Sequence, residues 1–377
     1  MAWPVFHLGG APDFTNDKPN YFGRPPPSQI NLLVVATGGE GCVGGGGGGG
    51  VIIRNNYTTG FTPWSGPPNP KNKYVFTLGS RANASGNNRV IDMHTYWKTY
   101  NQDGTAASTT TIYMGGEGGC DCQSGTGDGG SGGGGGGDSC FSGAGPSLAG
   151  QGNRGGDPVG GKITCSYYLR ICIMGYAQGG GGGGYSSAGG TASTSGICCT
   201  CYNQGNVYYP RGVPGTGGTG LNLAPYLSSY LQTIISGGNS VLANAGYTGY
   251  NTLWASSGGG ACGAVANLCP GICCDVVRGS KSSSGGGPGA GSGDNPSATG
   301  FGCGSGGGAY YGVSGPTGAS LVIASYQGKP ATLVSEISQG GYGLNHYDTS
   351  TDKTYHVLLG PPDSTYTNYS WDATLQF

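Results

Sequence analysis

The amino-acid sequence predicts a mainly β protein: an antiparallel, jelly-roll β-sandwich that carries packed polyglycine II helices and one short inserted α-helix. Three observations lead to this prediction. Glycine supplies 86 of the 377 residues, against roughly 7% in average proteins. Short apolar segments alternate with glycine runs along the chain. The chain also holds 25 tyrosines and 5 tryptophans with only 9% charged residues, whereas disordered chains are poor in aromatic residues and rich in charge.

The N-terminal residues 1–29 are expected to form an extended docking arm. Prolines at 4, 12, 19 and 25–27 exclude a helix and favour the polyproline II conformation. Such an arm is seldom stable alone, so we expect it to dock on a neighbouring protein. Residues 30–330 are expected to form the glycine-rich domain, and residues 331–377 a C-terminal β module or a second arm.

Predicted strands and glycine-rich runs alternate through the main domain. The strands are expected at 30–35, 51–53, 73–78, 109–114, 163–176, 319–326, 333–337 and 354–359, and the runs lie at 44–50, 132–137, 179–184 and 304–312. In the polyproline II conformation, seven residues span roughly 20 Å, which is about the length of a β-strand. Without Cβ atoms, such helices can pack side by side. Flexible linkers are the alternative, but linkers are typically Gly/Ser mixtures that join two domains.

One segment has helical periodicity. Apolar residues at 227, 230, 231, 234 and 235 follow the i, i+3, i+4, i+7, i+8 pattern of a helix face. The sequence therefore predicts a short helix near 223–236. Pro225 suits its first turn, and Gly237 or Gly238 suits its C-cap.

The chain has fourteen cysteines, and disulfides are the favoured interpretation because many of them border glycine runs. Free thiols, or a four-cysteine zinc site built from Cys198, Cys201, Cys269 and either Cys273 or Cys274, are the alternatives. The predicted assignment contains no metal, and the pairing stays open. The disulfide candidates are Cys42, Cys120, Cys122, Cys140, Cys165, Cys172, Cys198, Cys199, Cys201, Cys262, Cys269, Cys273, Cys274 and Cys303.

Several classes of function are disfavoured. A net charge of −1 without a basic cluster argues against nucleic acid as a partner. No run of 18 apolar residues is present, so we expect no membrane insertion, and the N-terminus does not resemble a secretory signal. The four histidines lie in no catalytic or metal motif, and Asp92 with His94 and His346 with Asp348 are expected to be surface pairs. We therefore predict no enzymatic activity and no cofactor.

Three stretches resemble the glycine-rich domains of bacteriophage tail-fibre and adhesin proteins. They are LLVVATGG with its following glycine run, IYMGGEGG followed by GGSGGGGGGDSCFSG, and GGGAYYGVSGPTGASLVIASYQG. The same plan is similar to the glycine-rich ectodomain of anaplastic-lymphoma-type receptor kinases, which implies a tumour-necrosis-factor-like sandwich with packed polyglycine helices. The resemblance covers about residues 30–327. The cysteines, the helix and both terminal regions depart from it, and no functional residue carries over.

The resemblance implies a structural protein of the virion surface, a fibre or adhesin that binds a host-cell glycan or protein. The N-terminal arm would then bind other virion proteins, and a homotrimer is suggested by analogy with fibres. Candidate receptor-binding residues are Trp64, Tyr185, Tyr310 and Tyr311, because each aromatic ring lies beside glycine or proline; packing against the glycine runs is the alternative for each. The alternative functions are capsid decoration or cementing and, second, a secreted cellular glycine-rich matrix or ice-binding protein.

Overall fold

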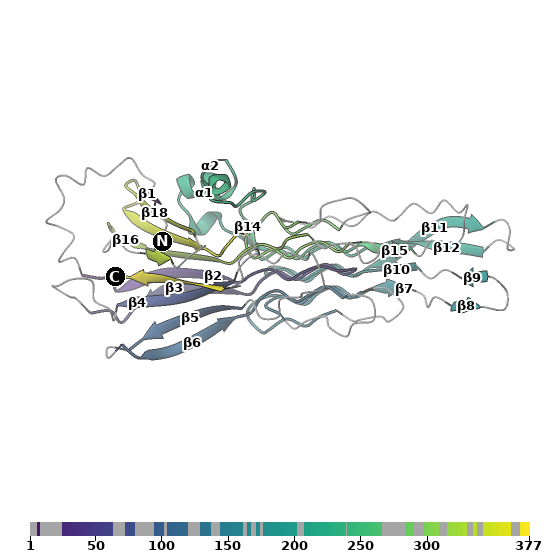
Figure 1. Ribbon diagram of the computed structural model, residues 1–377, viewed down its shortest axis with the longest axis horizontal. Coiled ribbons are helices and arrows are strands. Elements are labelled where there is room, and N and C mark those ends of the chain that lie inside the picture. The colour runs from purple at the N-terminus through teal and green to yellow at the C-terminus, as the bar shows by residue number, and fades with distance from the viewer. Residues whose placement is uncertain are drawn as a thin grey trace.

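The computed structural model is elongated, with a two-sheet sandwich at one end, glycine-rich segments along its middle and small sheets at the other end (Figure 1). The structure describes residues 6–7, 25–62, 72–79, 94–101, 104–119, 129–136, 144–160, 164–166, 171–173, 176–201, 207–238, 240–265, 284–289, 297–308, 315–329, 335–337, 342–362 and 370–377. Within these residues the secondary structure is mostly β with very little helix, which confirms the predicted class.

The sandwich consists of a six-stranded and a five-stranded sheet. The first has the order β1 (Phe6–His7), β18 (Tyr342–Asp348), β19 (Lys353–Leu359), β16 (Leu321–Gln327), β2 (Gln29–Val35) and β3 (Val51–Thr58). The second has the order β17 (Ser335–Ile337), β20 (Ser370–Gln376), β4 (Lys73–Gly79), β5 (Thr95–Tyr100) and β6 (Ala106–Ile112). Only β1 and β18 pair in parallel among these strands, so the predicted antiparallel arrangement is confirmed.

Alternation of side chains along the strands builds two cores, one on each face of the six-stranded sheet. Ile30, Leu32 and Val34 of β2 face the intersheet core, where they meet side chains of β4, β5, β16 and β20. Leu33 and Val35 face the opposite way, into the helix-side core. The uninterrupted apolar run of β2 is therefore explained by burial on both faces.

The predicted helix is confirmed, and it covers the helix-side core. It consists of the 3₁₀ turn η2 (Ala224–Tyr226) and α1 (Ser229–Ile235), and a second short helix, α2 (Ser240–Asn244), follows. Pro225 lies in η2, while α1 begins after Ser228, whose side chain accepts a hydrogen bond from the Leu231 N–H at 3.3 Å. Gly237, with φ of 76°, ends α1 as predicted. The N–H groups of Gly237 and Gly238 bond the carbonyls of Ile234 and Thr233, as in a Schellman motif.

Several strands differ from the sequence expectations. Residues 163–176 do not form one long strand: β8 (Thr164–Ser166) pairs back on β9 (Ile171–Ile173), and β10 (Tyr176–Gln178) joins another sheet. Strands β5, β18 and β20 were not expected, because polar residues interrupt their apolar pattern. The remaining short strands are β7 (Val159–Gly160), β11 (Ser193–Cys201), β12 (Val207–Val213), β13 (Leu221–Asn222), β14 (Trp254–Ala255) and β15 (Gly263–Val265).

Hydrogen bonds cross both predicted domain boundaries. Phe6 and His7 pair with Leu344 and Asn345 of β18. At the other boundary, β19 pairs along its whole length with β16. Strand β20 lies beside β4 in the five-stranded sheet. The strands after residue 330 therefore contribute to both sheets of the sandwich, and the division into domains stays a prediction.

The middle of the molecule is a glycine bundle, formed by residues 36–50, 113–119, 129–135, 153–156, 179–190, 215–218, 256–262 and 302–308. Its segments are neither helix nor ladder strand, and they bond to one another. Along residues 44–50, every third N–H donates to the same neighbouring segment. The N–H groups of Gly44, Gly47 and Gly50 donate to the carbonyls of Gly119, Gly116 and Tyr113, in that order. Those of Gly45 and Gly48 donate to the carbonyls of Gly180 and Gly183, and those of Gly46 and Gly49 donate to the carbonyls of Ser305 and Gly302.

The carbonyls of the same run follow the same repeat of three. They accept hydrogen bonds from three further segments. The carbonyls of Gly50, Gly47 and Gly44 accept from the N–H groups of Ala36, Gly39 and Cys42, in that order, and those of Gly48 and Gly45 accept from the N–H groups of Ser131 and Gly134. The carbonyl of Gly49 accepts from the Ser256 hydroxyl, and that of Gly46 accepts from the Gly259 N–H. Six segments thus surround residues 44–50. These hydrogen bonds satisfy the buried backbone groups that a run without regular secondary structure would otherwise leave unpaired.

Steric space explains why the run is pure glycine. A Cβ atom built on any of residues 44–49 would lie 1.9–2.3 Å from a carbonyl oxygen or carbon of a neighbouring segment. The bundle begins where β2, β3 and β6 join it, near Ala36, Gly50 and Tyr113. We call this its near end. Its far end lies near Val43 and Gly119.

Candidate binding surfaces

The far end of the bundle is where several of its segments turn back or continue outward. The N–H of Gly44 bonds to the carbonyl of Gly119, the N–H of Gly179 to that of Cys262, and the N–H of Gly308 to that of Cys42. Beyond this end lie the three-stranded sheet β15-β10-β7 and the pairs β8–β9 and β11–β12 (Figure 1). The fold therefore brings chain segments that are distant in sequence together at one tip.

Three of the four predicted receptor-binding residues lie outside the described residues: Trp64, Tyr310 and Tyr311. The described residue nearest to Tyr310 in the sequence is Gly308, which lies at the far end of the bundle. The assignment of these three side chains to a receptor stays a prediction.

Tyr185 lies at the near end. Its N–H donates to the carbonyl of Ser256 at 2.9 Å, and its carbonyl accepts from Asn153 Nδ2 at 2.6 Å. Its ring is partly buried against the helix-side core. Burial raises the pKa of Tyr226, and Tyr185 adds to this shift. These contacts attach the end of a glycine segment to the helix-side core. They agree with packing, the alternative to receptor binding that the sequence offered for this residue.

Two of the fourteen disulfide candidates are not in disulfides. Cys262 and Cys303 are buried and unbonded to another cysteine, so their predicted pairing is wrong. Cys303 is surrounded by backbone: its sulfur accepts from the Ser257 N–H at 3.4 Å and contacts the Trp254 carbonyl. Burial raises its pKa to about 11 although hydrogen bonds to the sulfur oppose the shift.

The other cysteines divide into three groups. Cys42 is disulfide-bonded. Cys165, Cys172, Cys198, Cys199 and Cys201 lie on the described strands β8, β9 and β11, and their pairing stays a prediction. Those outside the described residues are Cys120, Cys122, Cys140, Cys269, Cys273 and Cys274.

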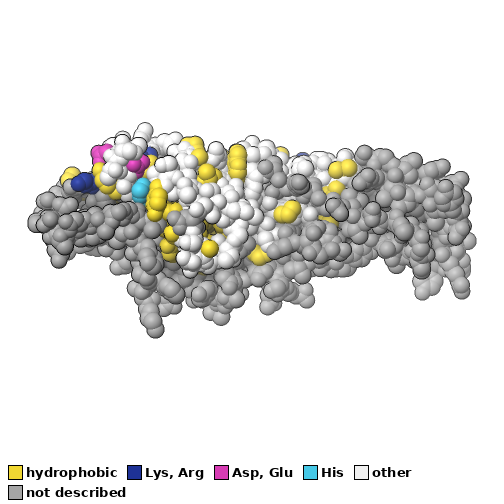
Figure 2. Space-filling model, turned by 90° about the horizontal axis from the view of Figure 1, so that it is seen from above, with side chains coloured by type: hydrophobic (Ala, Val, Ile, Leu, Met, Phe, Trp, Pro, Cys, Tyr) yellow, Lys and Arg dark blue, Asp and Glu magenta, His cyan; other side chains and the backbone are white. Residues whose placement is uncertain are grey.

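A second surface lies over the helix side of the sandwich, and sequence reasoning missed it. Tyr230 of α1 was expected on the buried helix face, but it is 38% exposed. Its ring lies 5.0 Å from that of His346, which in turn stacks on Tyr355. Lys353 Nζ lies 5.2 Å from the centre of the Tyr355 ring. Figure 2 shows a histidine among hydrophobic and charged side chains at the sandwich end of the molecule.

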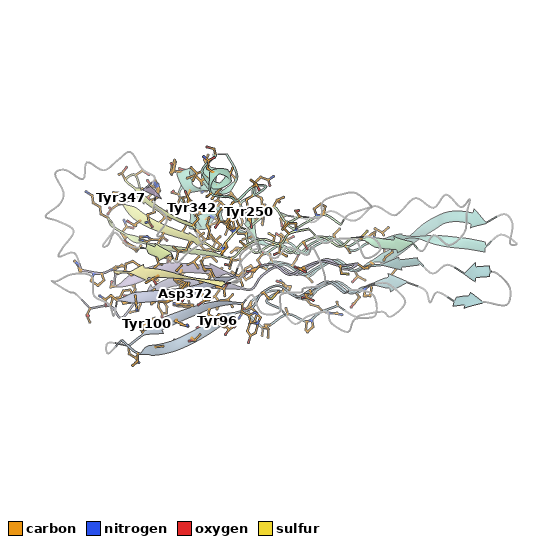
Figure 3. The ribbon with its side chains drawn as sticks, viewed as in Figure 1. Tyr96, Tyr100, Tyr250, Tyr342, Tyr347 and Asp372 are labelled. Atoms are coloured by element: carbon orange, nitrogen blue, oxygen red, sulfur yellow. The ribbon has the colours of Figure 1, made fainter. Side chains whose placement is uncertain are left out.

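The hairpin after β18 adds a carboxylate to this surface. Hydrogen bonds from Ser350 and Thr351, together with His346, lower the pKa of Asp348. His346 and Asp348 thus interact electrostatically, in line with the predicted surface pair. Figure 3 shows Tyr342 and Tyr347 on this side of the sandwich and Tyr96, Tyr100 and Asp372 on the opposite side.

Two further histidines, His94 and His356, form hydrogen bonds with other residues of the protein. His94 Nδ1 accepts the Met114 N–H at 3.1 Å, and its predicted partner Asp92 lies outside the described residues. His356 is buried against Asn345 and Tyr326. In the part of the chain that the structure describes, no three His, Cys, Asp or Glu side chains gather as a metal site. The helices described there are all too short or too polar to span a membrane.

No protein family, curated protein or solved structure matches this chain.

Proposed function

We propose that this chain is a structural protein of the virion surface, a fibre or adhesin component that binds a host-cell glycan or protein. The observation that carries the proposal is the repeat of three in the hydrogen bonds of residues 44–50, each repeat directed at a different neighbour. Three residues per turn without internal hydrogen bonds is the geometry of polyglycine II. We infer that the glycine bundle is a set of such helices. The proposal also includes a jelly-roll order of connections between the strands of the sandwich.

A bundle of this kind is suited to hold the two ends of the molecule apart and to present the residues at its far end to a partner. Its interior is backbone, so it offers few side chains for chemistry. Its amides can open only when packed segments separate, and this makes it stiff. A stiff rod between the sandwich and the small sheets beyond the far end would hold those sheets at a set distance from whatever anchors the sandwich (Figure 1).

The two ends have different proposed roles. The sandwich end would anchor the protein to other virion proteins through residues 1–29. The pairing of Phe6 and His7 with β18 of the sandwich supports this role for that end. The far end would present the receptor-binding loops. Tyr310 and Tyr311, which follow Gly308 at the far end, are therefore better candidates than Tyr185, whose backbone and ring are engaged at the near end.

A cell-binding assay tests this proposal. Fluorescently labelled full-length chain is titrated onto a panel of bacterial strains, and saturable binding to at least one strain is expected. The double variant Tyr310→Ala/Tyr311→Ala should lose this binding, while Tyr185→Ala should retain it. Absence of saturable binding to every strain tested would overturn the adhesin assignment. Electron microscopy with gold-labelled antibody should place the chain at a fibre tip; a lattice over the shell would instead support capsid decoration.

A further inference from the structure

We infer that Cys165 and Cys172 form a disulfide across the β8–β9 hairpin at the far end of the molecule. The two strands pair antiparallel, with Thr164 opposite Ile173, Cys165 opposite Cys172 and Ser166 opposite Ile171. The sequence alone left the pairing of fourteen cysteines open. The register of this hairpin selects one pair.

Backbone geometry carries the inference. Directly opposite residues of an antiparallel pair have α-carbons about 4.5 or 5.5 Å apart, depending on whether they exchange hydrogen bonds. Disulfides need α-carbon separations of roughly 4.4–6.8 Å, so both cases suit a bridge. A slip of one residue in this register would no longer set Cys165 opposite Cys172.

Other cysteines on paired strands lack such a partner. Cys199 lies opposite Tyr209 and Cys201 opposite Val207 in the β11–β12 pair. Among the strand pairs that the structure describes, β8–β9 alone sets one cysteine opposite another. Cys262 and Cys303 lie in the glycine-rich interior instead, where they are buried and form no disulfide.

The bond forms by thiol–disulfide exchange with a small-molecule disulfide such as oxidised glutathione. The thiolate of one cysteine attacks the small disulfide, forms a mixed disulfide and releases one small thiol. The second thiolate then attacks the protein sulfur of that mixed disulfide and releases the other small thiol. The two cysteines lose two electrons and two protons in total, and the small disulfide gains them.

The bridge closes a ring from Cys165 to Cys172 and so reduces the conformational freedom of the hairpin in the unfolded chain. Its value for display rests on the proposed function, because a pinned hairpin at the tip loses less entropy when it binds a receptor. The bond itself does not depend on that function.

Peptide mass mapping of the full chain tests the inference. The chain is folded with oxidised glutathione, its free thiols are blocked with iodoacetamide, and it is denatured and digested with trypsin. Cleavage after Lys162 and Arg170 places Cys165 on residues 163–170 (ITCSYYLR) and Cys172 on residues 171–211. We expect these two peptides to be joined, and peptide 163–170 to appear alone only after reduction.

Two variants identify the partner, because residues 171–211 also contain Cys198, Cys199 and Cys201. Cys172→Ser should release peptide 163–170 without reduction, whereas the matched control Cys199→Ser should leave the two peptides joined. The inference is overturned if Cys165 of the unaltered chain is blocked by iodoacetamide, if it is joined to the peptide that carries Cys42, or if the link survives in Cys172→Ser. Absence of receptor binding would leave these masses unchanged.

Discussion

At the scale of single residues, the missing Cβ of glycine is what allows the bundle to form. The Cβ of an alanine at position 47 would lie 2.2 Å from the carbonyl oxygen of Ser131. Atoms cannot approach so closely, and the contacting atom belongs to backbone that is itself hydrogen-bonded to Gly48 and Gly116. The neighbouring segment would have to move as a unit.

We therefore expect Gly47→Ala to lower the free energy of unfolding by about 3 kcal/mol or more, at the upper end of the usual cost of overpacking. Urea denaturation measures it. Gly104→Ala is the matched control: Gly104 has open space around it and a φ of 85°, so only about 1 kcal/mol of backbone strain is expected. Equal losses in the two variants would contradict the close packing of residues 44–50.

A second residue, His356, makes the stability of the sandwich depend on pH. It is 5% exposed, its Nδ1–H donates to Asn345 Oδ1 at 2.6 Å, and its Nε2 accepts from the Tyr326 hydroxyl at 3.3 Å. Burial lowers the pKa of His356 to about 4. The folded protein therefore resists protonation of this ring, whereas the unfolded chain takes up the proton at about pH 6.5.

Stability should consequently fall as pH drops from about 6.5 to about 4, by about 3 kcal/mol in total from this residue. Denaturation at a series of pH values measures the loss. His356→Gln should flatten that part of the profile even if the variant is less stable throughout. His346→Gln, which removes a histidine outside the buried core, should leave the loss in place; the opposite pattern would show that His356 is not responsible.

At the scale of elements, the strands of the sandwich continue directly into the glycine bundle. Strand β2 ends at Val35 and β3 begins at Val51, and residues 36–50 between them go out along the bundle and return. Strand β6 runs in the same way into residues 113–119. Because the strands are aligned in the sheets, the glycine segments that follow them begin side by side and in register with one another.

The end of β6 is capped by a side chain in place of another strand. Gln151 Oε1 accepts the Tyr113 N–H at 2.9 Å, and Gln151 Nε2 donates to the Thr111 carbonyl at 3.1 Å. Gln151→Ala should cost about 1–2 kcal/mol of stability because it leaves two backbone groups unpaired. It should also promote self-association, since it uncovers a strand edge. Denaturation and light scattering measure the two effects. Gln327→Ala, which removes an exposed hydrogen bond to Thr351, should change neither.

At the scale of the whole molecule, the bundle behaves as a rod only if its segments stay together. The amides of residues 45–50 donate to three different segments, so exchange with solvent requires those segments to separate. Hydrogen-exchange mass spectrometry should find this run as protected as β16. The exposed tip of the β5–β6 hairpin, at residues 104–105, provides the fast-exchanging reference. If the glycine run exchanges as fast as this hairpin, it is a linker and the rod is wrong.

Much of the local structure followed from sequence. The apolar runs at 30–35 and 354–359 are strands, because branched and aromatic residues buried on a sheet leave a clear pattern. The helix was expected from its periodicity, and Gly237 ends it. Polar strands such as β5 were missed, since alternation with Lys98 and Thr99 hides their buried Trp97. The Tyr230–His346 surface was missed because its members come from distant segments.

The sequence by itself determined that the glycine runs are architectural: pure runs bounded by strands, in a chain rich in tyrosine and poor in charge, predict packing. Only the tertiary structure decided which segments surround which. Glycine has no side chain to encode a partner or a register, so nothing in residues 44–50 specifies Gly116, Gly183 or Ser305 as neighbours. That choice comes from the strands at the near end, whose side chains align the sandwich and so align the glycine segments that grow from it.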